Sequence, residues 1–388
     1  MENFNAIEKI TFKQNALEDL ACHLKKYKKV LIITSITPKT LYLNVLCNYL
    51  NDKQIDFEIL CLKENVCNFK NLLLCCSYSQ NCDCVLSFGM GNVCDLTKLT
   101  AFKQKISYVV CPTAIPNFSA FSNVCYFKNE LKTTKIECYF PEKIFIDEGF
   151  IIKSPESLIF SAFSYIFSFY ETYVNEYVNS TLFSSPDFEF LNKLKEILQK
   201  TEGLINYVEI NKNLTLLNLM DNLIELFQLC LTKNISFSAI DLAANSCKNN
   251  FGKECLISSS TLLQVYKSFW KSNLTYQNIP NIERCLNILC KKGEKEQILF
   301  DFCENNKKFT EERFIFKAKA EKINILNILE KTIIKLSKIS KKLCNLECSE
   351  TKIVFEKNLY DNLIYHSLTS NNFQLNAILR LGYLNMIV

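Results

Sequence analysis

Glycine is scarce in this chain, and its placement is the strongest constraint on the fold. Only seven glycines occur in 388 residues, and two of them fall within Gly89–Asn92. The apolar run 85–88 before this segment is typical of a buried parallel strand, and a helix is expected to begin at about Val93. A strand that ends on glycines and continues as a helix presents backbone N–H groups to a phosphate. Such a turn also occurs without a ligand where a residue needs a positive φ. The segment alone therefore leaves both interpretations open.

A second apolar run, 106–111, follows and ends at Pro112-Thr113-Ala114. The order strand, glycine turn, helix, strand and Pro-Thr loop is rarer than any one of its parts. Alternation of short apolar runs with helical patterns continues over residues 1–150 and predicts a doubly wound parallel sheet, whose ligand crevice lies at the carboxyl ends of the strands. Gly89 and Thr113 both fall at such ends, and so does Ser35.

The predicted strands and helices of this first part have the following bounds. The strands are expected at Lys9–Phe12, Val30–Thr34, Phe57–Leu62, Val85–Phe88, Tyr108–Cys111, Asn123–Phe127 and Lys143–Ile146. The helices between them include Ala16–Lys25, Pro38–Leu50 and Cys94–Phe102.

The pattern changes at Ser154. Ser154 suits an N-cap, Pro155 the first turn of a helix and Glu156 the positive end of its dipole. Helical periodicity with few glycines and prolines then extends to Val388. We therefore predict an α/β nucleotide-binding domain over 1–152 and an all-α domain over 153–388.

The order of these motifs resembles the iron-containing alcohol dehydrogenase and dehydroquinate synthase superfamily, and within it the glycerol-1-phosphate dehydrogenases. In that family a loop G-G-G-(S/T)-x-x-D-x-x-K binds the cofactor pyrophosphate, and the P-T-A segment lies beside the nicotinamide and the substrate. Further segments that resemble the family are Ile7–Tyr27, Lys28–Thr34, Asp147–Leu158 and, near the end, Phe373–Leu384. The resemblance implies a Rossmann-like, dehydroquinate synthase-like fold and binding of NAD or NADP. The cofactor-binding positions that it implies are Gly89, Met90, Gly91, Asn92, Asp95, Lys98, Thr113 and Ser35, with Met90 and Asn92 departing from the family pattern.

The family's metal ligands, one Asp and two His, have no counterparts in this sequence. Tyr165 stands at the Asp position. The region 235–275, where the histidines are expected, contains none, and alignment places Ala239, Lys253 or Cys255 there. The two histidines of the chain, His23 and His366, are read as incidental, and Phe118 replaces the substrate-facing Asp of the glycerol-phosphate branch. We therefore predict no metal site.

Composition excludes several other classes of protein. The 45 basic and 40 acidic residues give a net charge of +5, which does not indicate a nucleic-acid partner. Twenty dispersed cysteines without a C-x-x-C spacing are expected to be reduced, buried thiols in a cytoplasmic protein. The uncharged apolar stretch Ser157–Tyr170 is too short to cross a bilayer, so no membrane span is expected. The segment Lys331–Leu343 is expected to be the solvated face of a packed helix.

Two functions stay open at this stage. The first is an NAD(P)-linked oxidoreductase acting on a small polyol or its phosphate, with Lys98, Tyr165 or Lys253 replacing the metal as polarising group. The second is a catalytically inactive relative that binds a nucleotide or serves as a scaffold. A small molecule or nucleotide is the expected partner in both, and a homo-oligomer is compatible with both.

Overall fold

The structure is a computed structural model that describes residues 9–129, 133–183, 187–231, 238–246, 250–272 and 311–347. The chain divides into two compact units, one formed by Met1–Ala162 with Leu204–Thr232 and the other by Phe163–Gly203 with Lys233–Val388. Residues 204–232 thus belong to the first unit, although they follow the predicted boundary at 152/153.

Six parallel strands form the sheet of the first unit, in the order β1-β8-β5-β4-β2-β3. β4 is buried at all five of its residues, as the apolar run in the sequence predicts. The chain leaves β2 toward β3 on one side and returns to β4 on the other, so the strand order reverses between β2 and β4. This topology confirms the predicted doubly wound sheet. In open sheets of this kind ligands bind at the carboxyl ends of the strands where the order reverses, which here are β2 and β4. The strand bounds are β1 Ile10–Lys13, β2 Val30–Ser35, β3 Phe57–Leu62, β4 Cys84–Phe88, β5 Ser107–Cys111 and β8 Lys143–Asp147.

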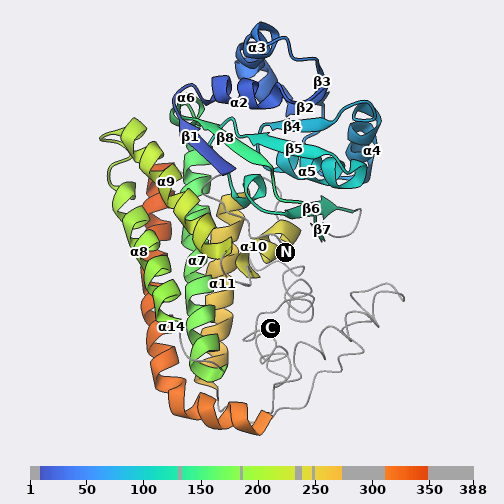
Figure 1. Ribbon diagram of the computed structural model, residues 1–388. Coiled ribbons are helices and arrows are strands. Elements are labelled where there is room, and N and C mark those ends of the chain that lie inside the picture. Colours follow the sequence, from blue (N-terminus) through green and yellow to red (C-terminus); the bar gives the residue numbers. More distant parts are fainter. Residues whose placement is uncertain are drawn as a thin grey trace. The chain divides into compact units, whose positions relative to one another are not determined.

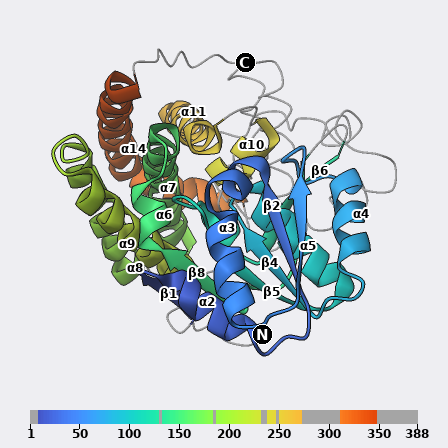
Figure 2. The same cartoon turned by 90° about the horizontal axis from the view of Figure 1, so that it is seen from above.

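Helices cover both faces of this sheet (Figures 1 and 2). Helices α2 (Ala16–Leu24) and α3 (Ile36–Asp52) share one hydrophobic core with the strands. Helices α4 (Phe69–Tyr78) and α5 (Asn92–Gln104) pack against each other, and α5 contacts β4 and β5. Burial of apolar side chains on the two faces holds the sheet between these helix layers.

One predicted strand lies outside the parallel sheet. The segment predicted at Asn123–Phe127 forms β6 (Val124–Lys128), which pairs antiparallel with β7 (Thr133–Glu137) in a separate hairpin. The sequence did not predict β7, because its side chains are half-buried or exposed and include no continuous apolar run. The hairpin packs against α5 through β6.

The end of the first unit is also described. Asp147 caps the short helix α6 (Glu148–Ile152) by accepting a hydrogen bond from the Gly149 N–H at 2.9 Å. The hydroxyl of Ser154, the residue predicted as an N-cap, accepts a hydrogen bond from the Ile115 N–H at 3.0 Å. It thereby ties the loop after β5 to the start of α7 (Glu156–Phe183). Helix α9 (Lys212–Leu231) packs against α6.

The second unit is helical throughout its described residues. α10 packs on α11, and α11 packs on α14. The Tyr266 hydroxyl of α11 donates a 2.6 Å hydrogen bond to the buried Glu171 carboxylate of α7. In α14, Leu336, Ile339 and Leu343 are buried, as expected for a packed helix. The helices of this unit are α7 from Phe163 onward, α8 (Phe188–Ile205), α10 (Ser238–Ser246), α11 (Phe251–Lys271) and α14 (Glu311–Glu347).

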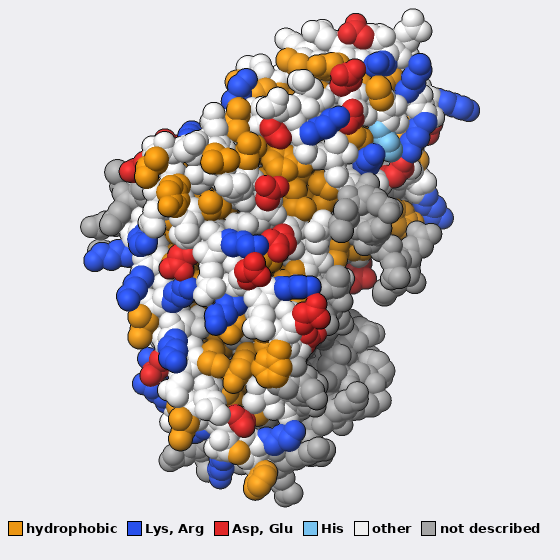
Figure 3. All heavy atoms as spheres, turned by 60° about the vertical axis from the view of Figure 1, so that its left-hand side comes forward, with side chains coloured by type: hydrophobic (Ala, Val, Ile, Leu, Met, Phe, Trp, Pro, Cys, Tyr) orange, Lys and Arg blue, Asp and Glu red, His pale blue; other side chains and the backbone are white. Residues whose placement is uncertain are grey.

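Surface charge and apolar helices concern two expectations from the sequence, that the protein has no nucleic-acid partner and no membrane span. Acidic and basic side chains are interspersed on the face shown in Figure 3. One described helix, α9, is long and apolar enough to cross a membrane by length and composition alone. Half of its apolar window is buried, as also happens in the core helix of a globular protein, so this is weak grounds for a membrane span.

A charged cluster ties α2 to the segment before β8. The Glu142 carboxylate accepts hydrogen bonds from the Lys26 ammonium and, at 2.6 Å, from the Tyr27 hydroxyl, and His23 lies 3.3 Å away. Burial alone would raise the pKa of Glu142, but the hydrogen bonds from Lys26 and Tyr27 outweigh it and lower this pKa to about 2.

We expect Glu142→Gln to lower the free energy of unfolding by about 1–2 kcal/mol at pH 7, because it removes bonds to a charged, partly exposed acceptor. The folded-state pKa of Glu142 is depressed, so its contribution is present above the unfolded-state pKa of about 4.3 and is lost as pH falls toward 2. Urea unfolding of both proteins between pH 3 and 7 measures this difference.

Glu58→Gln is the control, because Glu58 forms an exposed ion pair with Lys29 at 3.3 Å. Its loss is expected to be below about 1 kcal/mol. A Glu142→Gln effect no larger than this, or one that grows as pH falls, would contradict the account.

Candidate functional site

The turn between β4 and α5 has the backbone geometry that the sequence predicts. The Gly89 N–H donates to the Cys111 carbonyl at 3.2 Å, which joins the ends of β4 and β5. Gly91 has φ +60° and is the N-cap of α5, and its carbonyl accepts from the Asp95 N–H at 3.0 Å. A Cβ added at Gly91 would meet no atom within 4 Å. Gly91 is therefore kept for its backbone conformation, and it faces open space at the amino end of a 13-residue helix.

The two residues that depart from the family pattern lie in the same turn. Met90 is half-buried, and Asn92 is exposed. The Asn92 amide donates to the Asn65 carbonyl at 2.8 Å. This contact links the first residue of α5 to the loop 63–68 between β3 and α4, and spacing in the sequence gives no sign of it.

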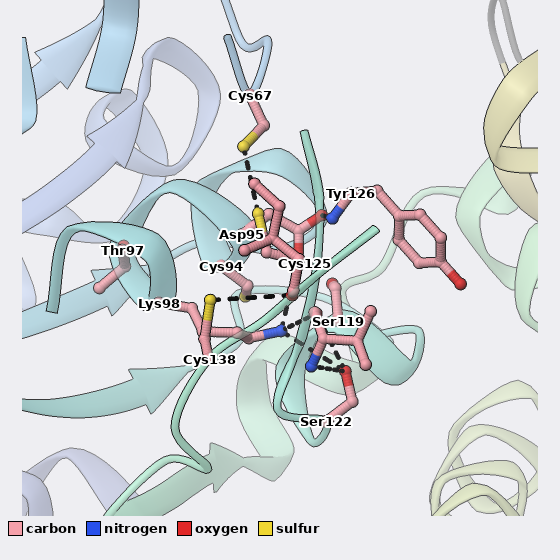
Figure 4. Close-up of polar contacts among 12 residues, drawn as sticks. Cys67, Cys94, Asp95, Thr97, Lys98, Ser119, Ser122, Cys125, Tyr126 and Cys138 are labelled. Carbon is pink, nitrogen blue, oxygen red and sulfur yellow. Dashed lines mark hydrogen bonds and ion pairs between the residues drawn. The ribbon is translucent and has the colours of Figure 1, made fainter. Parts of the chain in front are cut away.

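Asp95 and Lys98 are buried inside the first unit (Figure 4). The Lys98 ammonium is fully buried and donates to the Val124 carbonyl at 2.5 Å and to the Ser122 hydroxyl at 3.4 Å. Asp95 lies 3.4 Å from Lys98 and accepts from the Tyr126 N–H at 3.4 Å. Both side chains therefore hold the backbone of β6 against α5. In this structure both side chains thus support the turn at the start of α5 through contacts made inside the first unit.

Burial also sets the ionisation of Asp95. It raises the pKa of this carboxyl to about 6, against the opposing effect of the Lys98 charge and of the hydrogen bond from Tyr126. Removing Lys98 would leave Asp95 without its charged partner in a dry environment.

The other predicted positions lie at the same edge of the sheet. Thr34 pairs with Phe88 in register, and Phe88 pairs with Cys111. Ser35, the last residue of β2, and Thr113, which follows β5, therefore lie at the ends of the two strands that flank β4 and its glycine turn. Ser35 is half-buried and is the N-cap of α3 without a side-chain capping bond, whereas Thr113 is buried. The structure thus brings Ser35, the turn and Thr113 together at the carboxyl edge.

Phe118 replaces an Asp that the resemblance places near the substrate. It lies in a short 3-10 helix, Phe118–Ala120, and is buried. Its ring meets that of Phe227 in α9 edge to face, with centroids 5.4 Å apart. This position of the first unit is therefore apolar.

The residues at the family's metal positions can be tested against the chemistry of zinc and iron. Tyr165 is buried, and its ring lies 6.2 Å from that of Phe251 at the start of α11. Ala239 and Cys255 are buried as well. Together with the half-buried Lys253 this set supplies a phenol, a thiol and an amine. Zinc and iron take three or four His, Cys or carboxylate ligands in one place. The residues do not fit the metal, and aromatic packing joins α7 to α11 at this point.

No group of three His, Cys, Asp or Glu side chains arranged for a metal ion occurs within the described part of the chain. His23 contacts Glu142 in the first unit, and His366 lies outside the described residues.

Comparison with known proteins relates part of the chain to one superfamily. A family model described as iron-containing alcohol dehydrogenase matches residues 11–155. This segment is therefore similar to the iron-containing alcohol dehydrogenases. The match covers every strand of the parallel sheet and ends at the start of α7.

Curated relatives point to one branch of the superfamily. The chain is 23% identical over 168 residues to a glycerol-1-phosphate dehydrogenase, NAD(P)+, of Geobacillus thermodenitrificans. It is 24% identical over 154 residues to the protein of that name from Methanospirillum hungatei. The aligned part spans 41% and 42% of the length of these relatives, and 41% and 40% of this chain.

Solved structures of the superfamily share the fold. An iron-containing alcohol dehydrogenase from Thermococcus thioreducens matches with a TM-score of 0.63 at 11% identity, covering 98% of this chain and 97% of its own. An NADH-dependent butanol dehydrogenase A from Thermotoga maritima matches with a TM-score of 0.60 at 13% identity, covering 96% of each chain. The dehydroquinate synthase-like fold is thereby confirmed.

We expect Lys98→Met to lower the free energy of unfolding by about 3–5 kcal/mol, because it leaves the buried Asp95 carboxyl without its charged partner. The double variant Asp95→Asn/Lys98→Met is expected to lose less than the sum of the two single variants. Chemical denaturation of the four proteins in a double-mutant cycle measures the coupling.

Lys103→Met is the matched control, since Lys103 lies exposed on the same helix. Its effect is expected to be within about 0.5 kcal/mol. Additive losses in the cycle, or a Lys98→Met loss equal to the control, would contradict the supporting role assigned to Lys98.

Proposed function

We propose that this chain binds NAD or NADP with the cofactor pyrophosphate at the amino end of α5. The observation that carries the proposal is Gly91, which combines a positive φ, open space where a Cβ would lie, and a position opening α5. Backbone N–H groups at that helix end and the helix dipole favour an anion. The strand order reverses between β2 and β4, where open α/β sheets bind their ligands.

The roles proposed for the predicted residues differ with their position. Gly89 and Gly91 shape the turn, and Met90 and Asn92 border the phosphates. Ser35 lies where the adenosine ribose is expected, and Thr113 lies on the nicotinamide side. Asp95 and Lys98 act through the backbone they hold, so we propose them as positioning residues rather than direct phosphate ligands.

The reaction that we propose is NAD(P)-linked oxidoreduction of a small polyol or polyol phosphate, without the metal of the superfamily. The names of the curated relatives support the cofactor and the substrate class. The set Tyr165, Ala239, Lys253 and Cys255 supports the absence of a metal, because it lacks the required ligands. A tyrosine or lysine that polarises the substrate in place of a Lewis acid restores only part of several kcal/mol of transition-state stabilisation. Turnover is therefore expected to be slow.

A second candidate is a catalytically inactive relative that binds a nucleotide or serves as a scaffold. The packing of Tyr165 against Phe251 favours it, since apolar rings occupy the position where the resemblance places a ligand. Both candidates share the nucleotide site and differ in hydride transfer.

We expect NADH and NADPH to bind the wild-type protein and to bind Gly91→Val at least about tenfold more weakly, a difference of about 1.4 kcal/mol. A β-branched residue at φ +60° is strained and fills the space that the phosphate needs. Titration followed by nicotinamide fluorescence measures both affinities.

Gly203→Val is the matched control, because a Cβ at Gly203 also meets no atom within 4 Å but its φ is not positive. Met90→Gly removes the side chain between the two glycines and is expected to bind at least as tightly as the wild type. Equal binding by wild type and Gly91→Val, or no binding by either at millimolar nucleotide, would leave the turn without a ligand role.

We expect the purified protein to hold no stoichiometric zinc or iron, and chelators to leave its nucleotide affinity unchanged. Elemental analysis and titration before and after chelation measure this. Stoichiometric metal removed by chelator with loss of activity would overturn the metal-free proposal. NADH formation from polyols or polyol phosphates would select the oxidoreductase, and nucleotide binding with no turnover would select the inactive relative.

A further inference from the structure

Two cysteines of the first unit, Cys67 and Cys125, lie in direct contact with each other. The Sγ atoms of Cys67 and Cys125 are 3.6 Å apart, and both residues are fully buried (Figure 4). Cys67 belongs to the loop 63–68, and Cys125 belongs to β6. The contact therefore joins two segments that are 58 residues apart in the sequence.

The backbone around each thiol is held in place. On either side of Cys125, the Val124 carbonyl accepts from Lys98 and the Tyr126 N–H donates to Asp95. The Cys67 carbonyl accepts from the Lys128 N–H at 2.7 Å. These bonds keep the two segments side by side whether or not the sulfurs are linked.

The loop that carries Cys67 is anchored at its other residues as well. The Asn71 amide donates to the Val66 carbonyl at 2.8 Å and to the Glu64 carbonyl at 3.0 Å. The Asn68 side chain caps α4 by accepting from the Asn71 N–H at 2.9 Å. A disulfide has an S–S bond of about 2.05 Å, so the two sulfurs, now 3.6 Å apart, must approach by about 1.5 Å to form one.

We propose that Cys67 and Cys125 are a pair of thiols that hydrogen peroxide oxidises to a disulfide. The sulfur of one thiolate attacks a peroxide oxygen, the O–O bond breaks, and the released oxygen leaves as water after taking a proton. The resulting sulfenic acid is attacked by the second thiolate, which forms the S–S bond and breaks the S–O bond, releasing a second water. Two electrons pass from the two sulfurs to the peroxide.

The environment makes this reaction slow. The hydrogen bond with Cys67 and burial both raise the pKa of the Cys125 thiol, so its thiolate is scarce at neutral pH. Exposed Cys22 reacts with oxidants and alkylating reagents before the pair does. The disulfide is therefore expected to accumulate over hours and faster at higher pH.

The link would leave the fold unchanged and restrict the unfolded chain. Closing a loop of 58 residues removes much of the entropy of the unfolded state. The loop 63–68 also carries Asn65, which contacts Asn92 at the start of α5. Oxidation would thus fasten this loop to the hairpin next to the turn.

The test begins with the intact reduced protein. Accessible thiols are first blocked with N-ethylmaleimide, and the protein is then treated with hydrogen peroxide, denatured, alkylated with iodoacetamide and digested. Mass spectrometry is expected to find a Cys67–Cys125 cross-linked peptide that disappears after dithiothreitol. Oxidation is expected to raise the Tm of the blocked protein by about 5 °C or more.

Cys125→Ser and Cys67→Ala are expected to lose both the peptide and the Tm shift, whereas Cys138→Ser, a buried cysteine near Cys125, is expected to keep both. The wild-type mass measurement remains decisive if a variant fails to fold. A cross-link from Cys125 to Cys138, or no cross-link after all accessible thiols are blocked, would overturn the proposal. The mass readout does not depend on nucleotide binding, so its failure is separable from failure of the proposed function.

Discussion

The buried ammonium of Lys98 is the interaction on which the candidate site depends. Instead of water, this ammonium group contacts the Val124 carbonyl, the Ser122 hydroxyl and the Asp95 carboxylate. These partners lie on α5, on β6 and just before β6, so one side chain fixes the helix relative to the hairpin. Because α5 begins at the glycine turn, the direction of its amino end is set by contacts made one to two turns further along the helix.

The strands show how much of this fold local pattern can predict. Continuous apolar runs predicted β2, β4, β5 and β8 within a residue of their bounds, because strands buried on both faces leave that signature. β7 left none, since its side chains alternate between partly buried and exposed. The turn was predictable for a related reason: a glycine kept in a glycine-poor chain signals a backbone requirement, and Gly91 has the positive φ that meets it.

The partners of the predicted residues could not be predicted in the same way. The resemblance indicated Asp95 and Lys98, but their other partners lie more than twenty residues further along the chain and meet them only through tertiary packing. The same holds for Asn92 and Asn65, and for Cys67 and Cys125. The resemblance to a family indicated which positions to consider. Two of them, Asp95 and Lys98, are buried and contact the backbone of β6, which gives them a supporting role.

The aromatic contact between Tyr165 and Phe251 limits which substitutions the fold tolerates at position 165. Substituting an aspartate at position 165 would bury an unpaired carboxylate beside a benzyl ring, and two histidines would still be missing. Each single step toward a metal site is therefore destabilising and brings no ligand set with it.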